Sequence, residues 1–184
     1  MNAFDFDKTI YDGDSTTDFY KYCLKKYPSL VFFAPFHLIL FPFCGKTRAK
    51  QHFFRFLRHI PDVDAAVSDF WEKNIGKIKP WYKSVRRDDD VIISASPRFL
   101  VEIPCKKLGI GELIASEVDK KTGKYKGVNC SGAEKVRRFY EKCGTLSPEY
   151  FFSDSRDDTP MAKIAKYPFA VVKNDLFPWE ERFR

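Results

Sequence analysis

The feature that most constrains this chain is a short apolar run near its start that ends in two aspartates. Asn2 to Phe6 is expected to form a buried strand, with Asp5 and Asp7 at its carboxyl end. Because side chains alternate along a strand, both carboxylates are expected to begin on the same side. Like charges this close resist joint ionisation unless a cation lies between them or one carries a proton. The pattern favours a hard cation such as Mg²⁺, although an Asp-rich turn after a strand has the same sequence.

Strands and helices alternate along the rest of the chain. The further strands are expected at Val91–Ile93, Ile110–Ala115, Tyr150–Phe152 and Phe169–Val172, with a hairpin at Glu117–Gly127. The helices are expected at Asp18–Lys26, Asp62–Lys79, Pro97–Leu108, Gly132–Cys143 and Pro160–Ala165, and the tail to Arg184 as a covering arm. This order is typical of an α/β fold with a doubly wound parallel sheet.

Polar residues follow several of these strands. In doubly wound sheets the ligand lies beyond the carboxyl ends of the strands, at the switch point. The residues at or just past those ends are Asp5, Asp7, Ser94, Asp154 and Asp158. A carboxylate beside Mg²⁺ can attack phosphorus, and a second one can protonate the departing alcohol and later activate water. A hydroxyl and an ammonium, here Ser94 and Lys135, can hold the phosphoryl oxygens.

Each of these residues also has a structural explanation. Ser94 can cap the following helix, and Lys135 can be an exposed helical lysine. Asp154, Asp157 and Asp158 can cap the helix that begins at Pro160. All of them together, in this order and each on a suitable element, favour phosphoryl-transfer chemistry over these separate explanations.

Four segments carry a resemblance to a known family. Asp5–Thr9, Ile92–Pro97, Lys135 and Ser153–Met161 resemble the four motifs of the haloacid dehalogenase superfamily. The resemblance covers nearly the whole chain. It implies a Rossmann-like core and Mg²⁺-dependent phosphoryl transfer through an aspartyl-phosphate.

The resemblance also implies a role for each motif residue. Asp5 is then the nucleophile and Asp7 the general acid and base, which argues against dehalogenase chemistry because that reaction has no use for the second acid. The implied phosphate-binding residues are Thr9, Ser94, Ala95 and Lys135. The implied metal ligands are Asp5, Asp7 and Asp154, with Asp158 in a supporting position.

The segment between the first two motifs is similar to the inserted α-helical cap of the phosphoserine-phosphatase-like subfamily. We therefore expect a catalytic core made of residues 1–13 and 82–184, and a helical cap made of residues 14–81. Asp14 falls near the place where phosphoserine phosphatases use a glutamate to bind the substrate ammonium, so it is the candidate for substrate specificity.

Leu30–Cys44 is the most apolar stretch of the chain. Pro35 and Pro42 interrupt it, and it is shorter than the roughly 20 residues that span a bilayer. Basic residues flank it, and no acid occurs between Asp18 and Asp62. This pattern favours a segment that lies in the interface of an anionic membrane. The alternative is a helix pair packed on the main domain with a solvated basic face.

The substrate is predicted from departures within the motifs. Ala95-Ser96-Pro97 replaces the Gly-Gly-Phe of phosphoserine phosphatases, and Ser153 replaces a glycine. The apolar, basic cap and the Ser-Asp-Ser segment are more similar to phosphatidylglycerophosphatase C-type enzymes. We therefore expect a membrane phosphomonoester such as phosphatidylglycerophosphate. The alternative is a small soluble phosphomonoester such as phosphoserine.

Charge and cysteine content limit the remaining function classes. The net charge of +7 favours an anionic partner, such as a phosphorylated substrate or an anionic membrane surface. A membrane-binding module without turnover would not need the catalytic set, and no nucleic-acid-binding motif is present. The five cysteines are widely spaced, without C-x-x-C, and acids precede any long apolar run. We therefore expect a cytoplasmic protein, peripheral at the inner face of the membrane if its substrate is a lipid.

Overall fold

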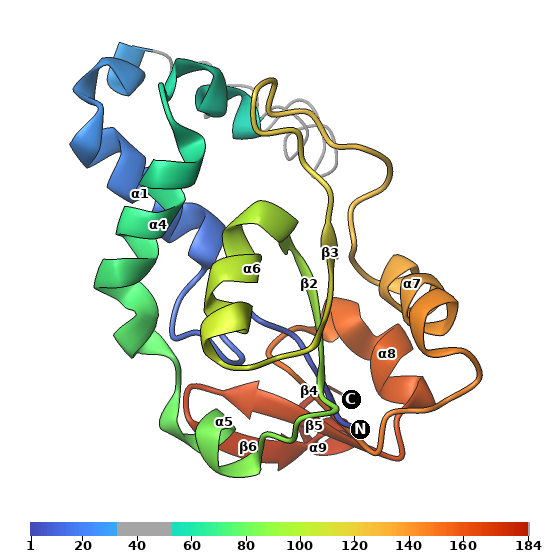
Figure 1. The fold of residues 1–184 in the computed structure, drawn as a ribbon. Helices are drawn as coiled ribbons and strands as arrows, with labels where there is room; N and C mark the ends of the chain where they lie inside the picture. The colour runs from blue at the N-terminus through green and yellow to red at the C-terminus, as the bar shows by residue number, and fades with distance from the viewer. Residues whose placement is uncertain (33–52, 184) are drawn as a thin grey trace.

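A mixed sheet forms the centre of the computed structural model, which describes residues 1–32 and 53–183. Its described strands follow the order β3-β2-β1-β4-β5-β6 (Figure 1). They are β1 (Ala3–Phe4), β2 (Val91–Pro97), β3 (Glu112–Ser116), β4 (Tyr150–Ser153), β5 (Tyr167–Val172) and β6 (Asp175–Pro178). The first five are parallel, and β6 is antiparallel to β5. The expected α/β fold with a doubly wound sheet is confirmed, with one antiparallel edge strand added.

Helices fill the connections between the strands. Between β1 and β2 lie α1 (Ser15–Lys26), α4 (Val63–Asn74), α5 (Pro80–Val85) and the 3₁₀ turns η1 (Pro28–Phe32), η2 (Phe54–His59) and η3 (Ile75–Lys77). The others are α6 (Arg98–Lys107), α7 (Ala133–Cys143), η4 (Arg156–Asp158), α8 (Thr159–Ile164) and α9 (Trp179–Arg182). Asp14 and Asp62 cap α1 and α4, because their carboxylates accept hydrogen bonds from Thr17 N (2.8 Å) and Ala65 N (2.9 Å).

Alternating side chains divide the core between the two faces of the sheet. Phe4 and Ile92 belong to one buried cluster, together with residues of α6 and of the helical segment between β1 and β2. Ala3, Val91 and Ile93 belong to a second cluster, together with residues of α7, α8 and α9. This period of two is what a strand buried on both faces requires. In Figure 1, α6 and α7 lie on opposite sides of β2 and β3.

The helical segment after β1 packs directly on the sheet. Phe19, Phe70 and Trp71 are buried in the same cluster as Phe4, and Trp71 Nε1 donates a hydrogen bond to Leu100 O of α6 (2.6 Å). The two ends of the segment are paired with each other. Asp12 N donates to Lys77 O (2.9 Å), and Lys79 N donates to Ile10 O (2.8 Å). The chain therefore leaves the sheet and returns to it at one place.

Two segments of the chain differ most from the sequence prediction. The helix expected to run to Lys79 ends at Asn74, where η3 follows, and Pro80 begins α5. Proline suits the first position of a helix because its missing N–H would have no partner there. The tail is more ordered than a covering arm, because it pairs as β6 and then forms α9, where Trp179 is 6% exposed.

The expected membrane segment is described only at its beginning. Leu30 is buried, whereas Val31 and Phe32 are 56% and 86% exposed. The remainder of Leu30–Cys44 lies outside the described residues. Among residues 1–32 and 53–183, no helix combines the length and the apolar character needed to cross a bilayer.

Candidate active site

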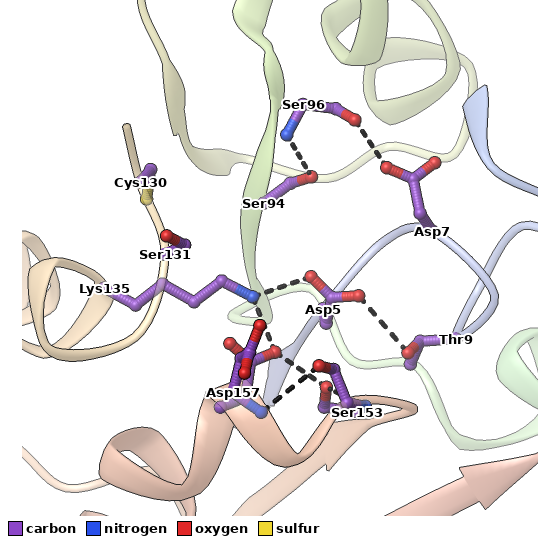
Figure 2. A network of polar contacts seen from close by, with 12 residues as sticks. Asp5, Asp7, Thr9, Ser94, Ser96, Cys130, Ser131, Lys135, Ser153 and Asp157 are labelled. Atoms are coloured by element: carbon purple, nitrogen blue, oxygen red, sulfur yellow. Dashed lines mark hydrogen bonds and ion pairs between the residues drawn. The ribbon is translucent and has the colours of Figure 1, made fainter. Parts of the chain in front are cut away.

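The expected site residues converge at the carboxyl edge of the parallel strands (Figure 2). Asp5 follows β1 directly, and its N–H is bonded to Phe152 O of β4 (2.9 Å). Ser94 lies in β2, and Asp154 comes directly after β4. Lys135 reaches them from the first turn of α7. The parallel topology therefore brings four distant segments together, as the sequence predicts.

Lys135 is the most buried charged group of the site. Its side chain is 2% exposed, and its Nζ lies 2.7 Å from both Asp5 Oδ1 and Asp158 Oδ2. Asp158 Oδ2 also accepts a hydrogen bond from Ser153 Oγ (2.7 Å). Burial disfavours the ammonium, but the two carboxylates outweigh this effect and raise the pKa of Lys135 above its usual value. Lys135 is therefore a fixed cation, not an exposed helical lysine.

Asp5 is a largely buried acid that lines the open cavity. Burial raises its pKa to about 7, and the charges of Asp158 and Asp7 act in the same direction, against the opposing effect of Lys135. Its Oδ2 accepts a weak hydrogen bond from Thr9 Oγ1 (3.4 Å). A cation bound here would favour the carboxylate form and offset much of the cost of burying it.

Asp7 points away from Asp5, toward the end of β2 (Figure 2). Its Oδ1 accepts from Ser15 N (2.6 Å), and its Oδ2 accepts from Ser96 Oγ. Burial, followed by the nearby charge of Asp14, raises the pKa of Asp7 to about 6, although both hydrogen bonds oppose this. An acid with a pKa near neutrality can both give and take a proton at physiological pH.

The expected phosphate-binding residues differ in their access to solvent. Thr9 is fully buried, and its Oγ1 accepts from Asp154 N (3.0 Å) while it bonds Asp5. Ser94 is 1% exposed, and its Oγ accepts from Ser96 N (3.1 Å). Ala95 and Lys135 line the open cavity. Phosphate binding by all four residues stays a prediction.

A cavity of about 460 Å³ opens above these side chains. The residues of the four motif segments that line it are Asp5, Asp7, Lys8, Ala95, Ser96, Lys135, Asp154, Ser155, Asp157 and Asp158. The other described residues that line it are Asp14, Thr16, Thr17, Phe53, Phe54, Tyr125, Asn129 and Ser131. The segment after β1 and the loop after β3 therefore both contribute walls. Asp14 is present as expected, with one oxygen also used as the α1 cap.

The donor set of the site suits Mg²⁺. Asp5 and Asp154 offer carboxylate oxygens, Thr9 links the two residues, and burial raises the pKa of both acids. Mg²⁺ binds through one or two carboxylates and completes its shell with water and substrate oxygens. Within the described part of the chain, no group of three or more His, Cys, Asp or Glu side chains could hold a metal ion. Joint ligation by Asp5, Asp7 and Asp154 therefore stays a prediction.

Several residues of the site escaped the sequence analysis. Ser96 holds Asp7, and Ser153 holds Asp158. Ser96 lies two positions after Ser94 in β2, and the period of two along a strand could have indicated it. Phe54 and Tyr125 come from segments distant from every motif, so no local signal marks them.

Comparisons with known proteins place the sequence in a family. A family model described as haloacid dehalogenase-like hydrolase matches residues 3–163. A histidinol-phosphatase of Neisseria meningitidis serogroup C (strain 8013) is 26% identical over 96 residues, which are 46% of this chain and 43% of that protein.

Solved structures extend the comparison to the fold. A protein of unknown function from Bordetella pertussis Tohama I superposes with a TM-score of 0.76 at 18% identity, covering 92% of this chain and 88% of the other. A phosphoserine phosphohydrolase-like protein from Francisella tularensis subsp. tularensis SCHU S4 reaches 0.66 at 17% identity, covering 95% and 88%. Identities this low show a shared fold alone. Because the family model spans most of the sequence, the chain belongs to the haloacid dehalogenase-like hydrolase family.

Proposed function

We propose that this protein is a Mg²⁺-dependent phosphomonoester hydrolase that works through an aspartyl-phosphate on Asp5. The observation that carries the proposal is the buried cation Lys135, held 2.7 Å from both Asp5 and Asp158 at the floor of an open cavity. A fixed cation beside a carboxylate provides a place for a phosphoryl group. Asp7, held separately by Ser96 and Ser15, supplies the second acid.

In the first half of the reaction, a carboxylate oxygen of Asp5 forms a bond to phosphorus. The bond from phosphorus to the alcohol oxygen breaks, and protonated Asp7 gives its proton to the departing oxygen. A pKa of about 6 lets a useful fraction of Asp7 carry that proton near neutral pH. The products of this half are the free alcohol and phosphorylated Asp5.

In the second half, the Asp7 carboxylate takes a proton from a water molecule. The water oxygen bonds to phosphorus, the bond from phosphorus to Asp5 breaks, and inorganic phosphate leaves. Asp5 is then a carboxylate again, and Asp7 is protonated for the next cycle.

The surrounding residues supply position and charge. Lys135 holds Asp5 and faces the phosphoryl oxygens, while Asp158 fixes Lys135. We assign phosphate binding to Ala95 and Ser94 at the end of β2, and to Thr9. Mg²⁺, held by Asp5 and Asp154, would reduce the repulsion between the nucleophile and the anionic substrate.

Removal of the nucleophile tests this assignment. We expect Asp5→Asn to lower Mg²⁺-dependent phosphate release by more than about a thousandfold, because the amide that replaces the carboxylate cannot form the acyl-phosphate. Asp88→Asn is the matched control, since the Asp88 side chain is fully exposed. Circular dichroism checks that both variants fold. Turnover by Asp5→Asn within tenfold of the wild type would contradict the mechanism.

We also propose that residues 14–81 act as a cap over a core of residues 1–13 and 82–184. The cavity supports this division, because Thr16, Thr17 and Phe53 line it from one part, while Ser96 and Tyr125 line it from the other. Asp14 lines the cavity from the start of the cap and is the proposed specificity residue.

The substrate has two candidate sources. The names of the similar proteins, a histidinol-phosphatase and a phosphoserine phosphohydrolase-like protein, favour a small soluble phosphomonoester. The exposed side chains of Val31 and Phe32 at the start of the apolar stretch favour a lipid phosphate reached at an anionic membrane surface. The comparison to make is phosphate release from phosphatidylglycerophosphate in mixed micelles against release from phosphoserine. Faster release from the lipid supports a peripheral membrane enzyme, and faster release from phosphoserine contradicts it.

A further inference from the structure

One side of the cavity is aromatic, in contrast to its acidic floor. Phe53, Phe54 and Tyr125 form this side, which we call the aromatic wall. The rings of Phe53 and Phe54 meet edge to face, with centroids 5.3 Å apart. Those of Phe54 and Tyr125 do the same at 5.9 Å. Edge-to-face contact is a preferred geometry of aromatic pairs, so the three rings support one another beside the cavity.

The aromatic wall joins two segments that are far apart in the sequence. Phe54 belongs to η2, and Tyr125 belongs to the loop after β3, which lies beside η2 in Figure 1. Gly123 lets the two backbones touch, because a Cβ there would come within 2.0 Å of Phe54 O. Arg58 Nε also donates to Thr122 O (3.2 Å). Phe54 is 3% exposed, whereas Phe53 and Tyr125 are half-buried, so these two rings provide most of the accessible surface of the wall.

The charged side chains that line the same cavity are mostly negative. Six described carboxylates line the cavity, namely Asp5, Asp7, Asp14, Asp154, Asp157 and Asp158, against the two cations Lys8 and Lys135. Lys135 already has two of these carboxylates as partners. A second anionic group on the substrate would therefore meet like charge in addition to the aromatic surface.

We propose that the aromatic wall is the leaving-group subsite, and that the alcohol released from the substrate carries an apolar or aromatic group and no carboxylate. The proposal rests on the phosphomonoesterase activity proposed above, since it concerns the alcohol of that reaction. Contact with the wall removes apolar surface of both partners from water, and a ring can stack against Phe53 or Tyr125. The apolar group can belong to a soluble aromatic alcohol or to an acylated glycerol.

The test compares esters of primary alcohols, so that leaving-group chemistry stays similar. With Mg²⁺ present, we expect kcat/KM for 2-phenylethyl phosphate to exceed that for glycerol 3-phosphate and for phosphoserine by about tenfold or more. A lysophosphatidic acid in detergent micelles forms a parallel arm. Preference for it over 2-phenylethyl phosphate assigns the apolar group to a lipid, and the reverse assigns it to a soluble alcohol.

Two tyrosine variants test whether this substrate preference depends on the aromatic wall. We expect Tyr125→Ser to lower the ratio of kcat/KM for 2-phenylethyl phosphate over glycerol 3-phosphate by about tenfold. Tyr140→Ser is the matched control, because Tyr140 is 37% exposed on α7 and is absent from the described cavity lining. An unchanged ratio in Tyr125→Ser, or a wild-type preference for phosphoserine, would overturn the proposal.

A binding measurement separates this proposal from the activity on which it rests. Calorimetry with Asp5→Asn should show tighter binding of 2-phenylethyl phosphate than of glycerol 3-phosphate, and Tyr125→Ser in the same background should remove the difference. Tighter binding without any phosphate release by the wild type would refute the phosphatase but support the aromatic subsite. Release without any binding preference would support the phosphatase and refute the subsite.

Discussion

At the scale of single residues, a serine hydroxyl holds Asp7, the residue that we propose as the general acid and base. Ser96 Oγ donates to Asp7 Oδ2 and lies 3.0 Å from Thr16 Oγ1, at the start of α1. Ser15 N holds the other oxygen of Asp7 at 2.6 Å. Asp7 therefore takes its orientation from the end of β2 and from the first turn of the helical segment. We propose that Ser96 is a positioning residue, which would act on the reaction by orienting Asp7.

Loss of the Ser96 hydroxyl should impair proton transfer to the departing alcohol. We expect Ser96→Ala to lower kcat/KM for alkyl phosphates by about tenfold, and to change kcat/KM for 4-nitrophenyl phosphate by less than about threefold. The reason is that 4-nitrophenolate leaves without a proton, whereas an alkoxide needs one. Steady-state kinetics on both esters measure how much kcat/KM falls for each.

The conservative variant serves as the control for this prediction. Ser96→Thr keeps the hydroxyl and should restore most of the activity toward alkyl phosphates. An equal loss on both esters would mean that Ser96 supports the structure of the site and has no role in orienting Asp7.

The site residues that could be predicted from the sequence are those whose position depends on the order and direction of the strands. Asp5 and Asp154 follow strands and Ser94 lies in β2. Parallel strands bring their carboxyl ends together whatever the side-chain details are. Which residue contacts Asp7, by contrast, depends on side-chain positions to within a few ångströms, and topology alone does not give these. In the sequence, Ser96 stands out only as a departure from a family pattern, whereas in the structure its hydroxyl contacts Asp7.

At the scale of elements, the loop after β3 depends on one aspartate. The expected hairpin is present, with an antiparallel bridge between Val118 and Tyr125. Asp119 Oδ1 accepts from Lys121 N (3.0 Å), Thr122 N (2.8 Å) and Thr122 Oγ1 (2.9 Å). Gly123 then continues the turn with φ of +67°. The turn thus holds Tyr125 in the aromatic wall.

The pH dependence of this turn follows from its hydrogen bonds. The bonds from the Thr122 N–H and hydroxyl lower the pKa of Asp119 to about 2. A carboxyl whose pKa is lower in the folded state stabilises that state above its unfolded pKa, and loses the effect as pH falls toward the folded pKa. We expect Asp119→Ala to lower the Tm at pH 6, and the difference from wild type to shrink between about pH 4 and pH 2.

Thermal denaturation followed by circular dichroism across this pH range gives the measurement. Asp88→Ala is a suitable control, because Asp88 is fully exposed and its nearest cation, on Arg86, is 3.8 Å away. A Tm difference between Asp119→Ala and wild type that stays constant from pH 6 to pH 2.5 would refute the role of the charge.

The elements that could not be predicted from the sequence are short, and their formation depends on tertiary contacts. β6 has four exposed residues and no buried face of its own, so its sequence lacks the strand pattern. It forms because β5 offers an unpaired edge and the chain reverses at Lys173, which has φ of +55°. The α1 and α4 helices, by contrast, carry Asp caps and an apolar face, and both were predicted.

At the scale of the whole molecule, the connection between sheet and helical segment includes a buried lysine. Lys79 is 2% exposed, and its Nζ donates to Lys8 O and Lys173 O. Burial lowers the pKa of Lys79, and the charges of Asp12 and Asp154 oppose that effect. One side chain therefore joins the loop after β1, the end of the helical segment and the β5–β6 turn.

A cation held by Asp5 and Asp154, the ligands proposed above, should stabilise the entire fold. A ligand that binds only the native state adds about 2.7 kcal/mol at a concentration 100 times its Kd. For a chain of this length, we expect Mg²⁺ to raise the Tm by about 5 °C or more, and a chelator to reverse the shift. Asp154→Asn should remove most of the shift, because it deletes a carboxylate proposed to hold the ion, whereas Asp88→Asn should keep it. An equal Mg²⁺ shift in wild type and Asp154→Asn would place the cation elsewhere.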